Sequence, residues 1–129
     1  MTGKNKGKKK KYRYRKIHIP LSYNESEVPN IHRIVDLVAN KELSGWRFVE
    51  ALNFTVDEKT GLSRPAVIKF KRPKRGKLRT IIFDYMPVTV ANDGLAPDSG
   101  PGWEKVGVIE YDALKRPRTI LFRKENTER

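Results

Sequence analysis

Apolar and polar positions alternate near the start of the chain, where the apolar residues Ile17, Ile19 and Leu21 each follow a residue of another kind, namely a lysine, a histidine and a proline. This period of two predicts a strand with one buried face. Pro20 has no amide hydrogen to donate to a neighbouring strand, so the strand is expected to lie at a sheet edge or to end there.

The pattern then changes to a helical period, with apolar residues spaced by three and four positions. These residues are Ile31, Ile34, Val35 and Val38. Capping residues between 24 and 27, with Pro29 in the first turn, are expected to begin the helix. Gly45 suits the left-handed conformation that ends many helices.

The remaining apolar runs predict β-structure, mainly two hairpins joined by a further strand-rich segment. The expected segments span residues 46–56, 65–72, 78–90, 102–111 and 117–123. In the first of them the apolar set changes face between Phe48 and Val49, which indicates a β-bulge. The total is about six strands and one helix.

The two predicted hairpins repeat the same residues in the same order. The first contains Gly45-Trp46, Arg64-Pro65 and the run from Ile68 to Arg72, and the second contains Gly102-Trp103, Arg116-Pro117 and the run from Ile120 to Lys124. The echo extends upstream, because Tyr85 to Thr89 repeats the strand-and-proline pattern of His18 to Ser22. A fixed-order repeat indicates one supersecondary unit used twice.

The two halves differ in the segment before each hairpin. Residues 92–102 are too rich in glycine and proline for a helix and are expected to form a loop where the first half has its helix. The matched positions of Trp46, Trp103, Phe70 and Phe122 favour packing in the core over stacking on bases.

These patterns predict an α+β fold with an antiparallel sheet of about six strands and one helix. We expect a single domain over residues 12–124, built from related halves at about 12–72 and 78–124. A small β-barrel carrying one helix is the alternative architecture. Residues 1–11 are expected to be a disordered basic tail and residues 125–129 a frayed end.

The run from Leu43 to Val49, together with Val67 to Arg72, also carries a family resemblance. Residues 12–72 resemble a family of short bacterial domains of unknown function that share a strand, a helix ending in Gly-Trp, and a hairpin closing on Phe-x-Arg. The resemblance implies a β-α-β-β unit and brings no activity, substrate or site residues. The second half departs from it because it lacks the helix.

Charge is distributed unevenly along the chain, whose net charge is +13. Residues 1–16 hold nine Lys and Arg and no acid, so the other 19 bases (28 − 9) face all 15 acids and leave +4 on the body. A second acid-free stretch lies between Glu58 and Asp84. The candidate nucleic-acid-binding residues are Lys8, Lys9, Lys10, Lys11, Arg13, Arg15, Lys69, Lys71, Arg72, Lys74, Arg75, Lys77 and Arg79.

A basic arm next to a basic hairpin is typical of a phosphate-binding surface, and Tyr12 and Tyr14 are suited to stack on unpaired bases. The leading hypothesis is therefore a small non-enzymatic protein that binds DNA or RNA. A solubilising tail, a localisation signal and a solvated strand edge are alternatives for the charged segments. The alternative function is a protein-interaction or inhibitor module of a mobile element that docks an acidic partner or forms a homodimer.

Basic residues recur in the second hairpin, and their function is open in the same way. They are Lys115, Arg116, Arg118, Arg123 and Lys124. The repeated Arg64 and Arg116 are expected to open hairpin arms, with phosphate clamping as the alternative. Asp84 is expected to be a solvent-facing strand residue.

The sequence offers little for catalysis or metal binding. It has no cysteine, and neither His18 nor His32 has a second ligand type at metal-binding spacing. No glycine motif suited to phosphate cradling is present. We therefore predict no catalytic residue, metal or cofactor, no membrane association, and a cytoplasmic location.

Overall fold

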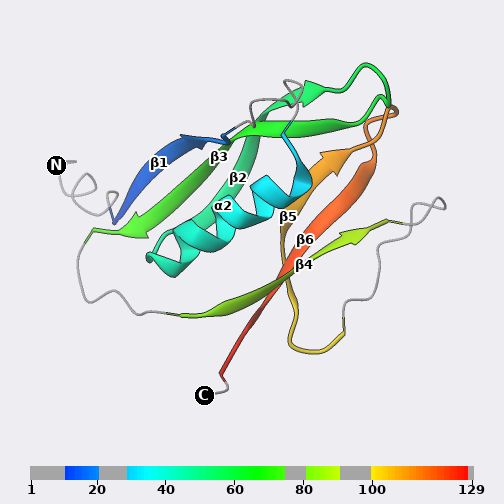
Figure 1. Cartoon of the computed structure of the whole chain (residues 1–129). Coiled ribbons are helices and arrows are strands. Elements are labelled where there is room, and N and C mark those ends of the chain that lie inside the picture. The colour runs from blue at the N-terminus through cyan, green and yellow to red at the C-terminus, as the bar shows by residue number, and fades with distance from the viewer. Residues whose placement is uncertain (1–10, 21–28, 75–80, 91–99, 128–129) are drawn as a thin grey trace, which may run out of the picture.

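The computed structural model describes residues 11–20, 29–74, 81–90 and 100–127 and has one helix packed on an antiparallel sheet (Figure 1). The elements are β1 (Tyr12–His18), α2 (Ile31–Leu43), β2 (Arg47–Val56), β3 (Ser63–Pro73), β4 (Phe83–Thr89), β5 (Glu104–Tyr111) and β6 (Pro117–Glu125). The α+β class with a six-stranded sheet is confirmed. The strand path runs from β1 to β4 without joining its ends, so the sheet is open and the barrel alternative is wrong.

The repeat seen in the sequence is a repeat of strand pairing. In the first half β3 pairs with both β1 and β2, and in the second half β6 pairs with both β4 and β5. Phe48 lies opposite Phe70, and Lys105 lies opposite Phe122. A register shift follows directly in both hairpins, before Glu50 and before Gly107, so the predicted bulge is confirmed and has an equivalent in the second half.

The upstream part of the repeat has a different register from the one that the prolines suggested. Arg15 lies opposite Phe70 and Met86 lies opposite Phe122, so these two residues occupy equivalent places. Pro87 is therefore inside β4, whereas the proline of the first half lies beyond the end of β1. An edge strand tolerates Pro87 because its missing amide hydrogen need not serve a further neighbour.

The helix begins one residue after Asn30, whose side chain accepts a hydrogen bond of 2.8 Å from the amide of His32. Pro29 precedes this cap instead of occupying the first turn, and the capping residues expected at 24–27 lie outside the described residues. Gly45 follows the helix with a φ of 100°, which confirms the predicted left-handed stop.

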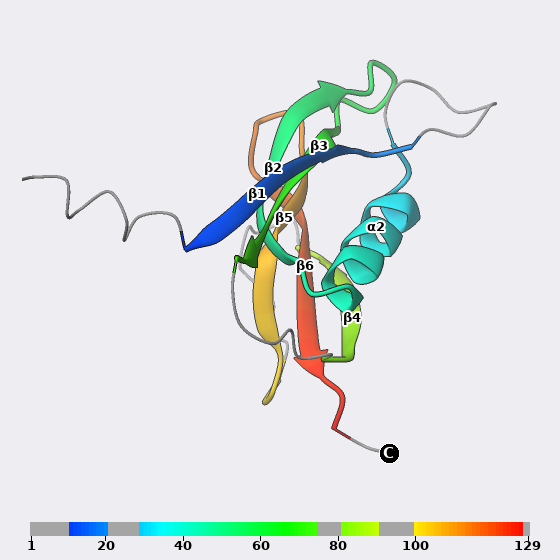
Figure 2. The ribbon, with the colours of Figure 1, turned by 90° about the vertical axis from the view of Figure 1, so that its left-hand side faces the viewer.

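The main core lies between the helix and the sheet, and Figure 2 shows the helix on one side of the strands. Its buried residues are Ile19, Ile34, Val38, Trp46, Ile68, Phe70, Ile109 and Leu121. A smaller cluster contains Val90, Ile120 and Phe122, with Trp103 half-buried beside it. The core positions expected for Trp46, Phe70 and Phe122 are confirmed, but the two phenylalanines of the repeat lie in different clusters.

A fully buried carboxylate, that of Glu42, joins the end of the helix to the sheet. Its Oε1 accepts a hydrogen bond of 2.6 Å from the hydroxyl of Tyr85, and its Oε2 accepts one of 3.0 Å from the amide of Phe48. Arg123 forms an ion pair with the same Oε2 and a second one, of 2.8 Å, with Glu104. The helix is thereby tied to β2, β4 and β6 through one side chain.

Burial by itself lowers the pKa of the Arg123 guanidinium, but hydrogen bonds to Glu104 and Glu42 outweigh burial and raise it. Arg123 therefore stays charged inside the fold. Its charge is balanced inside the protein by the carboxylates of Glu42 and Glu104.

A second buried carboxylate, that of Glu110, joins the two halves. It accepts hydrogen bonds of 2.8 Å from Arg64 Nε and 2.7 Å from the Thr119 hydroxyl. Arg64 also donates to the carbonyl oxygen of Pro29, just before the helix. Arg64 therefore serves the fold, and the phosphate clamp considered for it is not supported.

The C-terminal residues that we expected to fray are ordered in part. Strand β6 runs through Glu125, and the amide of Asn126 donates a hydrogen bond of 2.8 Å to the carbonyl oxygen of Ile82.

Tyr85 is expected to make stability sensitive to alkaline pH. Burial, followed by the hydrogen bond to Glu42, raises the pKa of the Tyr85 hydroxyl well above its usual value. The unfolded tyrosine ionises near a pH of about 10, so the stability that the protonated hydroxyl contributes is present below that pH and is lost as pH rises above it. Tyr85→Phe should cost about 1–2 kcal/mol at neutral pH.

Urea unfolding at a series of pH values from neutral to alkaline checks this expectation. The stability difference between the wild-type protein and Tyr85→Phe should narrow as pH rises past about 10. Tyr14→Phe is the matched control, because Tyr14 is exposed and should show no such change. A difference that stays constant over the whole range would contradict the assignment.

Candidate nucleic-acid interface

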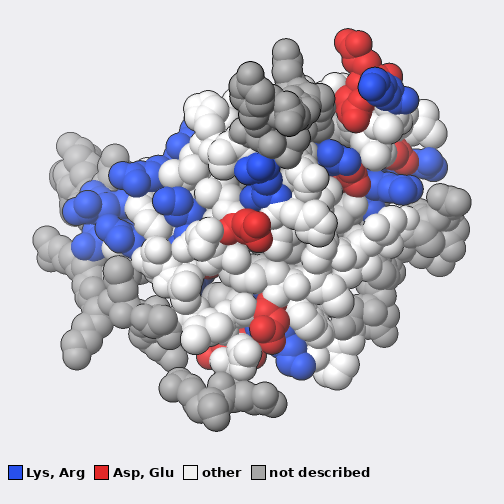
Figure 3. All heavy atoms as spheres, viewed as in Figure 1, with Lys and Arg blue, Asp and Glu red and all other residues white. Residues whose placement is uncertain are grey.

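The pairing of β1 with β3 brings the two basic segments of the sequence together at one end of the sheet. The facing pairs are Arg13 with Arg72, Tyr14 with Lys71, and Lys16 with Lys69, and the amide of Lys74 donates to the carbonyl oxygen of Lys11. Figure 3 shows Lys and Arg gathered where β1 begins and β3 ends. We call this group the basic patch: Lys11, Arg13, Arg15, Lys16, Lys69, Lys71, Arg72 and Lys74.

Two arginines of the basic patch lie on the helix side of the sheet. The guanidinium carbons of Arg15 and Arg72 lie 5.5 Å and 4.8 Å from the ring centroid of Trp46. The Trp46 side chain is only 8% exposed, so the arginines flank a core residue and hold their charge at the rim of the main core.

The opposite face of the same strands carries two exposed aromatic rings next to lysines. The Nζ atom of Lys69 lies 5.0 Å from the ring centroid of Tyr14, and that of Lys71 lies 4.6 Å from the ring centroid of Tyr12. Each lysine comes from the neighbouring strand at a diagonal position, a distance that long side chains span. Positive charge and aromatic surface are therefore interleaved on the outer face.

The charge of the basic patch is not neutralised by ion pairs among the described residues. Every salt bridge in that part of the chain uses Arg64, Arg116 or Arg123. Glu50 of β2 is the carboxylate in register with the basic patch, opposite Lys69. The basic patch therefore keeps an excess of positive charge.

Two arginines of the second hairpin, Arg116 and Arg123, behave differently. Arg116 is paired with Asp112, whose pKa is lowered first of all by the hydrogen bond from the Arg116 backbone amide. Arg123 is paired with Glu42 and Glu104. These two arginines are therefore neutralised by carboxylates of the fold, unlike the arginines of the basic patch.

The thirteen candidate residues predicted from the sequence fall into two groups. Seven candidates lie in the basic patch: Lys11, Arg13, Arg15, Lys69, Lys71, Arg72 and Lys74. Six lie outside the described residues: Lys8, Lys9, Lys10, Arg75, Lys77 and Arg79. Sequence reasoning left out Lys16, although its alternation with Ile17 already placed it on the solvent face of the first strand.

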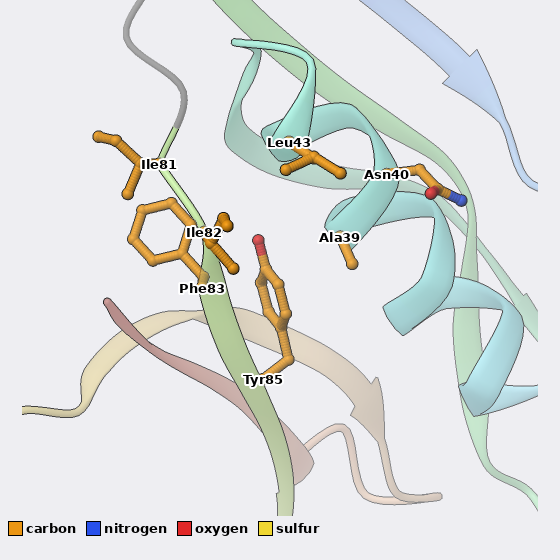
Figure 4. A pocket seen from close by; sticks show the side chains of 7 residues that line it. All are labelled: Ala39, Asn40, Leu43, Ile81, Ile82, Phe83 and Tyr85. Atoms are coloured by element: carbon orange, nitrogen blue, oxygen red, sulfur yellow. The ribbon is translucent and has the colours of Figure 1, made fainter. Parts of the chain in front are cut away.

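A hollow of about 140 Å³ lies between the end of the helix and the start of β4 (Figure 4). Its lining is mostly apolar and consists of Ala39, Asn40, Leu43, Ile81, Ile82, Phe83 and Tyr85. Pockets for drug-sized ligands usually measure about 300–1,000 Å³. The Tyr85 hydroxyl is engaged by Glu42, so the hollow offers few polar groups to orient a ligand.

Other chemistry is sparse in the described part of the chain. No group of three or more potential metal ligands occurs there, and both His18 and His32 are exposed. Asp84 is exposed on β4, as expected. The described helix is too short to cross a lipid bilayer.

Comparison of the chain with protein-family models, with curated proteins and with solved structures finds no match. The β1-α2-β2-β3 order is the arrangement implied by the resemblance of residues 12–72 to short bacterial domains. Membership of that family stays a prediction.

Proposed function

We propose that this protein binds nucleic acid by contacting phosphates through the basic patch, with the lysine-rich N-terminal residues as an extension of it. The role is non-enzymatic. The observation that supports it best is the β1–β3 pairing, which concentrates eight bases that form no ion pair with a described residue. The absence of cysteine suits a reducing compartment, so we place the protein in the cytoplasm.

Phosphate contacts of this kind provide affinity with little base selectivity. Each neutralised phosphate releases condensed counterions, so binding weakens steeply as salt increases. Contact with about six phosphates of duplex DNA gives a slope of about −5 for log K against log salt concentration.

The basic patch can be tested with two double variants that remove the same charge at different places. Lys69→Gln/Lys71→Gln alters the basic patch, and Lys105→Gln/Lys115→Gln alters exposed positions of the second hairpin. Binding of labelled oligonucleotides is measured by fluorescence anisotropy over a range of salt concentrations. The first variant should bind more weakly and lose about 2 from the salt slope, because each lysine contributes about 1.

The second variant should keep most of the wild-type slope. Equal losses in both variants would mean that net charge, and not the basic patch, determines binding. Weak binding by the wild-type protein at low salt, with no dependence of log K on log salt concentration, would refute the proposed function. A triple variant tests how much the N-terminal residues contribute to the binding affinity. It replaces Lys8, Lys9 and Lys10 with Gln.

A further inference from the structure

We infer that the outer face of β1 is a stacking platform for unpaired bases, with Tyr12 and Tyr14 as its rings, and that the ligand is a single-stranded nucleic acid. This inference rests on the proposed function and specifies which nucleic acid the basic patch takes. It is carried by the exposure of the two rings, by the lysines beside them and by their spacing along the strand.

The two rings are unusual for their exposure. Tyr12 is 39% exposed and Tyr14 is 57% exposed, and they are the aromatic residues among the exposed large hydrophobic side chains of the described chain. Tyr85 and Tyr111, in contrast, are half-buried and contact Glu42 and Phe54 respectively. Tyr12 and Tyr14 belong to neither core cluster, because the main core takes the opposite face of β1 through Ile17, and takes Ile19 just beyond the end of that strand.

The lysines leave one face of each ring available. Lys69 and Lys71 both reach from β3, and each places its ammonium group over one face of a ring. On its other side β1 is the edge of the described sheet, with no further strand, so a base can approach the rings from there. The lysine ammonium groups beside the rings supply positive charge for the phosphates of the same strand, and stacking of this kind tolerates any base.

The spacing of the rings selects between single and double strands. Residues two apart on a strand point to the same face and are separated by about 6.6 Å. Successive nucleotides along one strand of a duplex rise by only about 3.4 Å and remain stacked on each other. Two neighbouring bases reach both rings only when the strand is unpaired and stretched, so a duplex can use the lysines but not the tyrosines.

The test uses the full chain with Tyr12→Ala/Tyr14→Ala, which changes no charge. The probes are labelled oligo(dT) and oligo(U) of about ten nucleotides and a mixed-sequence duplex of the same length, measured by anisotropy. Single-strand affinity should fall at least about 20-fold, because stacking on each ring is worth about fivefold or more. The salt slope should stay the same, and duplex affinity should change by less than about threefold.

Two further variants make the result specific. Tyr12→Phe/Tyr14→Phe keeps the rings and should keep single-strand binding, whereas loss in this variant would point to the hydroxyls and overturn stacking. Val56→Ala/Leu114→Ala removes other exposed apolar side chains and should change nothing. The oligo(dT) and oligo(U) arms decide between DNA and RNA.

Equal losses for single strand and duplex in Tyr12→Ala/Tyr14→Ala, or no loss at all, would overturn the platform. A wild-type protein that binds the duplex and neither single strand would overturn the platform and leave the proposed function standing. A wild-type protein that binds none of the three probes would overturn both.

Discussion

Phe70→Ala is expected to lower the free energy of unfolding by about 4 kcal/mol, the largest effect of any substitution considered for this protein. Phe70 is fully buried in the main core, where side chains from the helix, β3, β5 and β6 meet. Its loss removes apolar burial and leaves a cavity among residues of both halves, which cannot collapse without moving the helix.

The repeat supplies a matched control, Phe122→Ala. Phe122 occupies the equivalent register position but lies in the smaller cluster and is 8% exposed. We expect a loss of about 3 kcal/mol there, the low end for a buried phenylalanine, since fewer buried residues surround it. Urea unfolding followed by circular dichroism measures both values. Equal losses in the free energy of unfolding would show that packing against the helix does not make Phe70 more important for stability than Phe122.

Glu42→Gln is expected to cost about 3 kcal/mol, because it removes the buried partner of Arg123 and leaves that guanidinium incompletely paired. The neutral amide also has only one oxygen for the Tyr85 hydroxyl and the Phe48 amide, which now use separate carboxylate oxygens. The exposed Glu58 is the matched control, and Glu58→Gln should leave stability within about 0.5 kcal/mol of wild type.

A double-mutant cycle measures the interaction energy between Glu42 and Arg123 apart from their other contacts. If Glu42 and Arg123 act together, Glu42→Gln/Arg123→Gln should be less destabilised than the sum of the single variants. Additive losses would mean that the two side chains contribute independently. A single Glu42→Gln variant as stable as the Glu58→Gln control would refute the importance of the buried carboxylate.

The network of Glu42 also bears on the proposed interface. Phe48 and Arg47 begin β2 beside the helix end, and Arg47 donates to the carbonyl oxygen of Glu42. The same helix end leads into Trp46, which Arg15 and Arg72 flank. The buried carboxylate therefore helps hold the turn against which the helix-side arginines of the basic patch pack.

Local patterns were sufficient for the elements of the fold. Alternation around Ile17 predicted β1, the helical spacing from Ile31 to Val38 predicted α2, and the repeated Gly-Trp hairpins predicted the β2–β3 and β5–β6 pairs and one bulge. These features depend on side chains within a few residues of one another, so a single sequence carries them. The α+β class followed from counting them.

The sequence was insufficient where the outcome depends on distant residues. Arg123 and Arg72 belong to the same repeated basic run, yet Arg123 enters a buried network and Arg72 stays in the basic patch. The difference comes from Glu42, which is far from both in sequence and gave no signal beyond being one acidic residue on a helix. Glu110 likewise holds Arg64 in a salt bridge within the fold, so that Arg64 does not add to the basic surface.

The sequence by itself thus determined which segments are strands or helix, that two halves share one pairing scheme, and that positive charge is concentrated in two segments. Only the tertiary structure decided that these segments become neighbours, through the β1–β3 register, and which arginines are neutralised. The physical reason is that backbone pattern is a local property, whereas charge pairing depends on which carboxylate the folded chain brings within a few ångströms.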